Sequence, residues 1–214
     1  MIEIFQHIFH LDFKWLFDNY GTTVYVILFC VIFIETGLVI MPFLPGDSLL
    51  FTAGLFAHLG FMNIAFVIVL LFIAAVLGDN VNYFIGKKIG LKVLKLKMGG
   101  KNLVKPEYLD KTQSFYQKYG TKTIILARFV PIVRTFAPFV AGVAEMKYRR
   151  FVLFDLLGGG LWICSMALAG YLLSDVPVLG PWIQKNIDKV AILIILISIL
   201  PIIFEFLKAR RAKK

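Results

Sequence analysis

Residues 35–54, ETGLVIMPFLPGDSLLFTAG, combine an apolar composition suited to a lipid bilayer with two carboxylates, two prolines and three glycines. Proline lacks a backbone N–H and glycine weakens a helix, so such residues interrupt a membrane-spanning helix. The interrupting residues are Pro42, Pro45 and Gly46. Glu35 and Asp47 flank the interruption, although a charge at membrane depth costs about 2.5–3.5 kcal/mol. The stretch predicts that segment 42–57 is a re-entrant hairpin, which enters the membrane and returns to the same side.

The chain has the composition of an integral membrane protein. Of its 214 residues, 59% are hydrophobic and 17% are charged, whereas about a quarter of the residues of a soluble domain are charged. Apolar runs of about 18 residues or more predict membrane-spanning helices. Such runs occupy residues 24–40, 61–85, 151–173 and 190–207. We therefore expect one all-α integral membrane domain over residues 1–214, with about four transmembrane helices.

Two further segments have the pattern of amphipathic helices that lie on a membrane surface. Residues 1–20 carry apolar side chains at helical spacing and lack the basic start of a signal peptide. Residues 104–120 combine lysines with a stripe of aromatic residues and threonine. The stripe consists of Tyr108, Thr112, Phe115 and Tyr119. For this second segment a solvated linker helix is the alternative.

Most lysines and arginines fall in a few clusters. They are absent from residues 15–86 and concentrated in 87–122, in 147–150 and in the tail 208–214. The net charge of +10 could indicate a nucleic-acid partner, but basic clusters beside apolar runs are typical of the cytoplasmic loops of membrane proteins. We therefore expect no nucleic acid, and we expect both termini to be cytoplasmic. Helical spans indicate a bacterial inner membrane, because outer-membrane proteins are barrels.

A second interrupted segment, 123–143, begins and ends beside basic clusters that are both expected in the cytoplasm, so it cannot cross the membrane once. Its interrupting and structural residues are Pro131, Pro138 and Gly142. We expect a re-entrant hairpin that enters from the face opposite to segment 42–57. Each hairpin ends in a similar sequence, FTAG at 51–54 and FVAG at 139–142. Paired broken segments of this kind predict an inverted repeat with a binding site near the membrane midplane.

Four charged residues of the two hairpins are the candidate functional site. Arg128 and Arg134 are candidates for binding a substrate phosphate, because a guanidinium grips phosphate with two parallel hydrogen bonds. Glu35 and Asp47 are candidates for proton coupling, because burial favours the protonated form of a carboxylate. The structural alternative is a pair of buried salt bridges that hold the hairpins together.

A second polar cluster lies near the end of the run 61–85. Asp79, Asn82 and Tyr83 share one helix face, so they either pack against a hairpin through hydrogen bonds or contact the substrate directly. Asp155 is alone in its helix and could pair with an arginine. Gly158 to Gly160 allow a close helix contact.

Several stretches of the chain resemble the DedA family of membrane proteins. The resemblance is carried by residues 35–54 above, by GDNVNYFIG at 78–86 and by ARFVPIVRTFAPFVAG at 127–142. The pattern F-x-P-x-x-R-x-x-x-P-x-x-A-G, which runs from Phe129 to Gly142, is its most specific part.

This resemblance implies two opposed re-entrant hairpins and transport of lipids across a membrane. In bacteria it implies the return of undecaprenyl phosphate, an anionic carrier lipid, with dependence on protons and the proton motive force. It places the essential acidic pair of the family on Glu35 and Asp47, and the arginine pair on Arg128 and Arg134.

Two other transport functions stay open. One is energy-independent scrambling of phospholipids, and the other is proton-coupled antiport of a soluble substrate. We do not expect an enzyme, since the sequence lacks the common hydrolase, metalloprotease and phosphate-loop motifs. The histidines, none of them near the arginines in the sequence, are His7, His10 and His58. No metal or cofactor is expected, and the sequence does not indicate an oligomeric state.

Overall fold

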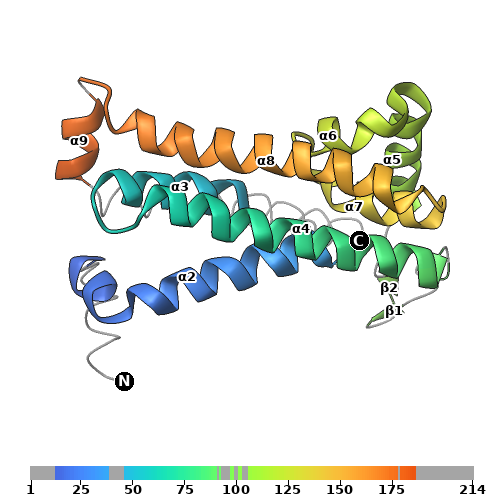
Figure 1. The fold of residues 1–214 in the computed structure, drawn as a ribbon, viewed down its shortest axis with the longest axis horizontal. Coiled ribbons are helices and arrows are strands. Elements are labelled where there is room, and N and C mark those ends of the chain that lie inside the picture. Colours follow the sequence, from blue (N-terminus) through green and yellow to red (C-terminus); the bar gives the residue numbers. More distant parts are fainter. Residues whose placement is uncertain are drawn as a thin grey trace, which may run out of the picture. The chain divides into compact units, whose positions relative to one another are not determined.

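The computed structural model describes residues 13–38, 46–90, 92, 97–98, 101–102, 106–177 and 179–186. Three of its helices contain stretches that are long and apolar enough to cross a membrane (Figure 1). These helices are α2 (Phe13–Gly37), α4 (Ile64–Ile89) and α8 (Tyr148–Leu173). They confirm three of the predicted spans. The fourth, 190–207, lies outside the described residues.

The remaining described elements are short. The helices are α3 (Gly46–His58), α5 (Pro106–Tyr119), η2 (Gly120–Lys122), α6 (Thr123–Ala127), α7 (Pro131–Val143) and α9 (Leu179–Lys185). Between α4 and α5, strand β1 (Lys97–Met98) pairs antiparallel with β2 (Lys101–Asn102). Apart from this pair, the regular structure of the described part of the chain is helical.

The chain divides into two compact units. Unit 1 comprises Met1–Phe29, Pro45–Leu70 and Cys164–Lys214, and unit 2 comprises Cys30–Leu44 and Leu71–Ile163. The divisions fall inside the three long helices, so α2, α4 and α8 each give one part of their length to each unit.

In unit 1, helix α3 packs directly on the backbone of α8. A Cβ atom on Gly54 would lie 1.9 Å from the carbonyl oxygen of Ala167, and one on Gly170 would lie 2.0 Å from that of Phe51. Only glycine permits so close an approach, because any side chain would overlap the facing backbone. The FTAG sequence is therefore a helix-packing motif.

In unit 2, helix α7 packs on α4 through the same arrangement. A Cβ atom on Gly142 would lie 2.0 Å from the carbonyl oxygen of Tyr83, and one on Gly86 would lie 2.1 Å from that of Phe139. The FTAG and FVAG sequences thus use the same two positions, the first for its carbonyl and the fourth for its glycine. This equivalence of contacts supports the internal repeat.

The segment 123–143 forms two helices, α6 and α7, with a break between them. Arg128 follows α6 directly, Val130 is extended, and Pro131 is the first residue of α7. This fits proline's fixed φ, which suits the start of a helix and favours an extended residue before it. The re-entrant course of this segment stays a prediction.

Of the residues named as interrupting or structural in this hairpin, Pro138 does not interrupt it. Pro138 lies inside α7, which continues to Val143. Membrane helices tolerate an internal proline because neighbouring groups satisfy the carbonyl that it leaves unbonded. Gly142 also lies within α7, where it permits the close contact with α4. In the first hairpin, α3 begins at Gly46, whereas Pro42 and Pro45 lie outside the described residues.

Helix α5 packs on α7 through a face that includes part of the predicted stripe. Leu109 and Thr112 are buried, whereas Tyr119 is 37% exposed. The hydroxyl of Tyr116 donates a hydrogen bond to the carbonyl of Ala137 over 2.9 Å. Burial raises the pKa of Tyr116, which keeps this hydroxyl protonated as a donor. The predicted stripe therefore coincides with the buried face at Thr112 and departs from it at Tyr119.

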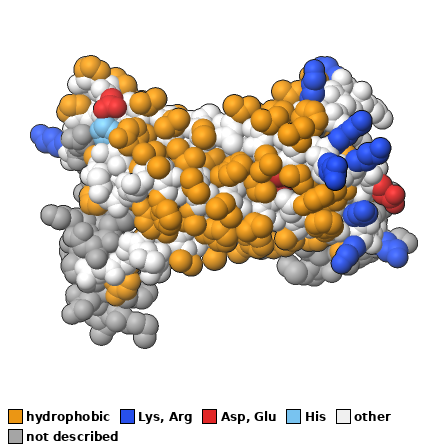
Figure 2. Space-filling model, in the orientation of Figure 1, with side chains coloured by type: hydrophobic (Ala, Val, Ile, Leu, Met, Phe, Trp, Pro, Cys, Tyr) orange, Lys and Arg blue, Asp and Glu red, His pale blue; other side chains and the backbone are white. Residues whose placement is uncertain are grey.

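The end of α4 and the start of α8 lie side by side in unit 2. The hydroxyl of Tyr148 donates to the side-chain oxygen of Asn80 over 2.7 Å, and Tyr83 stacks on Phe151 at 4.5 Å between ring centroids. Figure 2 shows basic side chains gathered in this region and hydrophobic side chains along the helices. The exposed basic residues include Lys87, Lys88, Arg149 and Arg150. Two of the basic clusters used to predict the orientation therefore lie close together.

Candidate functional site

Unit 2 contains a cluster of buried charged side chains. They come from four helices and from the break between α6 and α7, and none is more than 5% exposed. The cluster consists of Glu35, Asp79, Arg128, Arg134 and Asp155. We call these five residues the buried charge cluster. Charged groups are rarely buried in an apolar protein unless they are paired or functional.

Arg134 lies near the start of α7 and pairs with Glu35 near the end of α2. The Nη2 atom of Arg134 is 2.6 Å from Oε1 of Glu35. On α8, the ring of Trp162 lies 4.6 Å from Cζ of Arg134, which is a cation–π distance. The guanidinium is therefore held by a carboxylate and by an aromatic ring.

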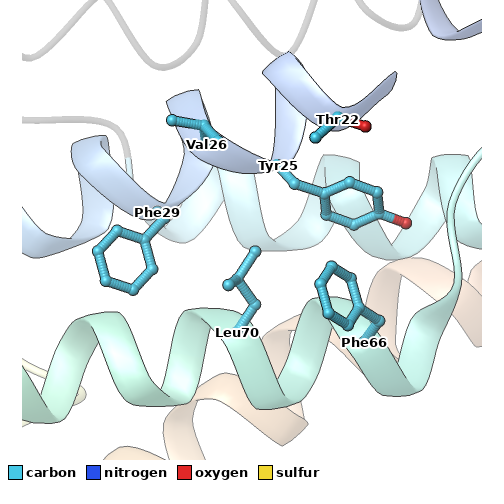
Figure 3. Close-up of a pocket in the computed structure, with 6 residues that line it drawn as sticks. All are labelled: Thr22, Tyr25, Val26, Phe29, Phe66 and Leu70. Atoms are coloured by element: carbon cyan, nitrogen blue, oxygen red, sulfur yellow. The ribbon is translucent and has the colours of Figure 1, made fainter. Parts of the chain in front are cut away.

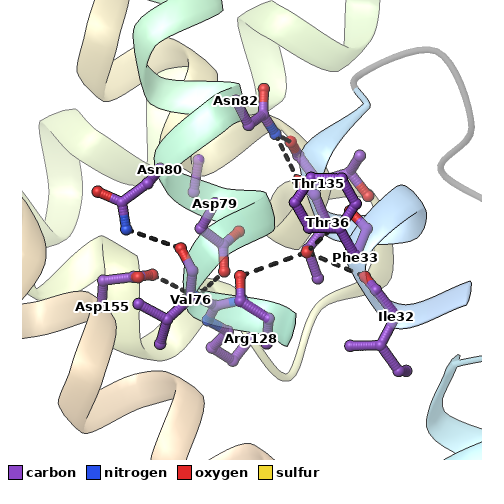
Figure 4. Close-up of polar contacts among 12 residues, drawn as sticks. Ile32, Phe33, Thr36, Val76, Asp79, Asn80, Asn82, Arg128, Thr135 and Asp155 are labelled. Atoms are coloured by element: carbon purple, nitrogen blue, oxygen red, sulfur yellow. Dashed lines mark hydrogen bonds and ion pairs between the residues drawn. The ribbon is translucent and has the colours of Figure 1, made fainter. Parts of the chain in front are cut away.

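Arg128 lies in the break between α6 and α7 and contacts two carboxylates. Its Nη2 atom donates to Oδ2 of Asp79 and also to Oδ1 of Asp155 (Figure 4). The two aspartates come from α4 and α8. The other terminal nitrogen, Nη1, is buried and makes no hydrogen bond to any part of the chain that the structure describes.

Asn82 holds the backbone beside Glu35 and Arg134 in place. Its side-chain nitrogen donates to the carbonyl of Thr36 over 2.9 Å and to that of Thr135 over 2.8 Å. Thr135 follows Arg134, and Thr36 follows Glu35. One amide therefore joins α2 and α7 at the residues next to their ion pair (Figure 4).

The end of α2 is also packed tightly on α4. A Cβ atom on Gly78 would lie 2.0 Å from the hydroxyl oxygen of Thr36. That hydroxyl donates to the carbonyl of Ile32 at 3.0 Å, with the carbonyl of Ala75 at 3.3 Å. Gly78 therefore allows α4 to carry Asp79 and Asn82 into the cluster.

The structure brings most of the predicted site residues together. Glu35 contacts Arg134 as the opposed-hairpin hypothesis expects, but the described partners of Arg128 are Asp79 and Asp155. Asp47 lies in the first turn of α3, in unit 1, and is half-buried. That Asp47 shares a pocket with the arginines stays a prediction.

Of the second polar cluster, Asp79 and Asn82 pack against the hairpin segment through hydrogen bonds, the first of the two roles considered from sequence. Tyr83 donates instead to the carbonyl of Met146, just before α8. Sequence reasoning did not identify Trp162. Its position two helical turns after Asp155 on α8 was the available signal, since residues seven apart share a helix face.

Unit 1 contains an apolar pocket of about 350 Å³. In Figure 3 the side chains of Tyr25 and Phe29 on α2 and of Phe66 and Leu70 on α4 extend into the space between the two helices. The lining residues are Thr22, Tyr25, Val26, Phe29, Phe66 and Leu70. The Tyr25 hydroxyl accepts a hydrogen bond from the backbone N–H of Asn63 at 2.9 Å, which leaves mainly hydrocarbon facing the pocket. No group of three or more metal-ligating side chains occurs among the residues described.

Comparison with known proteins places this chain among membrane proteins. A family model described as the VTT domain matches residues 44–172. The chain is 46% identical to protein DedA of Escherichia coli, over 98% of this chain and 94% of the relative. It is 39% identical to an uncharacterized membrane protein of Mycobacterium tuberculosis, over 94% of this chain and 87% of the relative. It is 31% identical to inner membrane protein YghB of Escherichia coli, over 92% and 88%. No solved structure matches the chain.

Proposed function

Because the chain belongs to the VTT-domain family, which is the DedA family of membrane proteins, we propose that it transports a phosphate-bearing lipid from one membrane leaflet to the other. The substrate class that we propose is a polyprenyl phosphate, with undecaprenyl phosphate as the first lipid to test. The single observation that carries the proposal is the pair of buried arginines in unit 2, at the start of α7 and in the break before it.

The chemistry of these arginines suits a phosphate ligand. A guanidinium stays charged in every environment and donates in a planar fork that matches phosphate oxygens. Each arginine uses Nη2 for a carboxylate, so a phosphate can replace a carboxylate as the partner. Such an exchange gives two states of the site, one closed by internal ion pairs and one occupied by lipid.

Proton coupling follows from the same exchange. Protonation of Glu35 removes the negative charge that holds Arg134 and so favours phosphate at the guanidinium. Asp47 is the second proposed proton carrier. Localisation in a bacterial inner membrane, with both termini in the cytoplasm, is part of this proposal, and the name of the relative YghB supports the membrane assigned.

Reconstitution of the purified protein into liposomes tests the proposal. The liposomes contain a polyprenyl phosphate, and the measured quantity is the rate at which its phosphate becomes accessible from the other side. We expect transport by the unaltered protein, loss of transport in Arg128→Ala and Arg134→Ala, and unchanged transport in Arg149→Ala, an exposed arginine in the same unit. Equal rates in protein-free liposomes, or transport by both buried-arginine variants, would exclude this function.

The same liposomes distinguish the two alternatives. Transport that ignores an imposed proton gradient and tolerates Glu35→Gln identifies an energy-independent scramblase. Movement of a soluble solute that requires a proton gradient, and that proceeds equally in liposomes without any phosphate-bearing lipid, identifies an antiporter of a soluble substrate.

A further inference from the structure

The contacts of Arg128 differ from those of Arg134 in their charge balance. The contact described for Arg134 is with the carboxylate of Glu35. Arg128 faces two, those of Asp79 and Asp155, and both reach the same nitrogen atom. The first pair is neutral when both groups are ionised, whereas the second group of three then carries one excess negative charge.

The surroundings described in unit 2 do not compensate this excess. The other charged members of the buried charge cluster are Glu35 and Arg134, which balance each other. Helix α5 contributes the neutral hydroxyl of Tyr116, and α6 contributes no charged side chain. The lysines and arginines at the ends of α4 and α8 are exposed.

An excess buried charge is costly, and a proton removes it. A buried charge without compensation is strongly destabilising, and two carboxylates that share a site are not both ionised at the same pH as separate ones, so one of them holds a proton. The atom Oδ2 of Asp155 is buried and makes no hydrogen bond to the described part of the chain. Bound there, a proton would leave Oδ1 of Asp155 as an acceptor for Arg128.

We propose that Asp79 and Asp155 form a shared proton-binding site around Arg128, in addition to Glu35 and Asp47. One proton is bound by this pair when Arg128 contacts both carboxylates. When a phosphate binds Arg128 through Nη1, the anion supplies further negative charge and favours uptake of a second proton. Only this link to transport rests on the proposed function, since binding of the first proton is a property of the protein alone.

Infrared difference spectroscopy of the purified full-length protein tests the site without any lipid substrate. Protonated carboxyl groups absorb in a region of the carbonyl spectrum separate from ionised ones. We expect a protonated, buried carboxyl at neutral pH that is lost in Asp155→Asn or in Asp79→Asn. It should persist in Glu35→Gln and in Asp110→Asn, a control for an exposed aspartate on α5.

Conservative variants protect this test against misfolding. Asp155→Glu and Asp79→Glu keep the carboxyl group, so the band should shift in frequency and remain. A band that survives in both asparagine variants, or that disappears in Glu35→Gln, overturns the proposal. Absence of the band from the unaltered protein overturns it as well.

A transport measurement tests the coupling of the second proton separately from the proposed transport function. In liposomes, the double variant Asp79→Asn/Asp155→Asn imitates the doubly protonated pair permanently, so the ratio of transport rates with and without a proton gradient should be smaller than in the unaltered protein. A gradient dependence that is unchanged in this double variant overturns the coupling role while transport itself stands. Absence of transport by the unaltered protein overturns the proposed function, and the infrared result still decides the proton site.

Discussion

Arginine occupies both buried cationic positions of unit 2, and the contacts explain why lysine would not serve. Arg134 uses a planar group to contact a carboxylate at one edge and the ring of Trp162 across its face. A lysine ammonium is a compact point charge that cannot keep both contacts in this geometry. The identity of the side chain therefore matters in addition to its charge.

Arg134→Lys should impair transport even though it preserves the charge. Loss of one charge-assisted hydrogen bond costs about 1.5–3 kcal/mol, which corresponds to about tenfold or more weaker binding of a phosphate. The measurement is the concentration of polyprenyl phosphate that gives half-maximal transport. Arg149→Lys is the exposed control. An unchanged half-maximal concentration in Arg134→Lys would contradict binding of the phosphate by parallel hydrogen bonds from the guanidinium.

Asn82→Leu should destabilise the protein through the two carbonyls that it leaves without their donor. Each buried polar group that loses its partner costs about 1–3 kcal/mol. Asn80 on the same helix is half-buried and donates to the carbonyl of Val76 in its own helix, so Asn80→Leu should cost less. Thermal unfolding in detergent gives the comparison, and equal losses would mean that Asn82 has no special role in joining α2 to α7.

Among single residues, the charged members of the candidate site were the easiest to predict from the sequence. A charge inside an apolar run is costly, so Glu35, Arg128 and Arg134 stood out in the sequence. The partner of each charge could not be derived in the same way. Asp155 was expected to pair with an arginine, and it contacts Arg128, but the sequence did not indicate which arginine, because the packing of α8 beside α6 decides this.

At the scale of the elements, the decisive contacts are backbone to backbone. The α3–α8 contact in unit 1 and the α4–α7 contact in unit 2 each use a pair of glycines facing carbonyl oxygens. In a membrane, helix association depends on such close packing, because burial of apolar surface from lipid gives no driving force. The glycines therefore contribute to stability in a way that composition alone does not reveal.

Gly142→Ala should separate α7 from α4. The added Cβ would lie 2.0 Å from the carbonyl oxygen of Tyr83, and overpacking of this kind costs about 1–3 kcal/mol. Gly160→Ala is the matched control, since its Cβ would lie 3.6 Å from the ring of Phe72, an ordinary contact. A thermal unfolding temperature that falls in Gly160→Ala as much as in Gly142→Ala would contradict the packing role.

The sequence predicted elements well where long apolar runs decide them and poorly where packing does. The spans at α2, α4 and α8 follow from length and composition. Within α7, however, Pro138 does not end the helix, and on α5 only part of the predicted stripe is buried, since Tyr119 at its end is exposed. Both outcomes depend on neighbouring helices that supply hydrogen bonds or contacts, and these partners cannot be inferred from the sequence of one segment.

At the scale of the whole molecule, the described contacts bear on the orientation of the chain. The end of α4 and the start of α8 lie together, so the basic residues at both positions are expected on one side of the membrane. The positive-inside rule assigns that side to the cytoplasm.

Cysteine labelling in intact cells tests this orientation. Lys88→Cys and Arg149→Cys, each made in a chain without Cys30 and Cys164, should be protected from a membrane-impermeant thiol reagent and become reactive once cells are opened. His58→Cys, near the opposite end of a predicted span, should label in intact cells. Labelling of Lys88→Cys and Arg149→Cys from opposite sides would contradict the predicted threading.

The division of α8 between the two units has a consequence for how the protein is made. A ribosome delivers α3 and α4 to the membrane well before it has synthesised Ala167 and Gly170, the surface on which α3 packs, or Asp155, which contacts Arg128. Neither unit can be completed until this late helix is synthesised. The early helices therefore stay in the translocon or in lipid with their packing glycines not yet in contact with a partner helix. A chain that stalls before α8 is expected to be a target for membrane proteases rather than a half-active product.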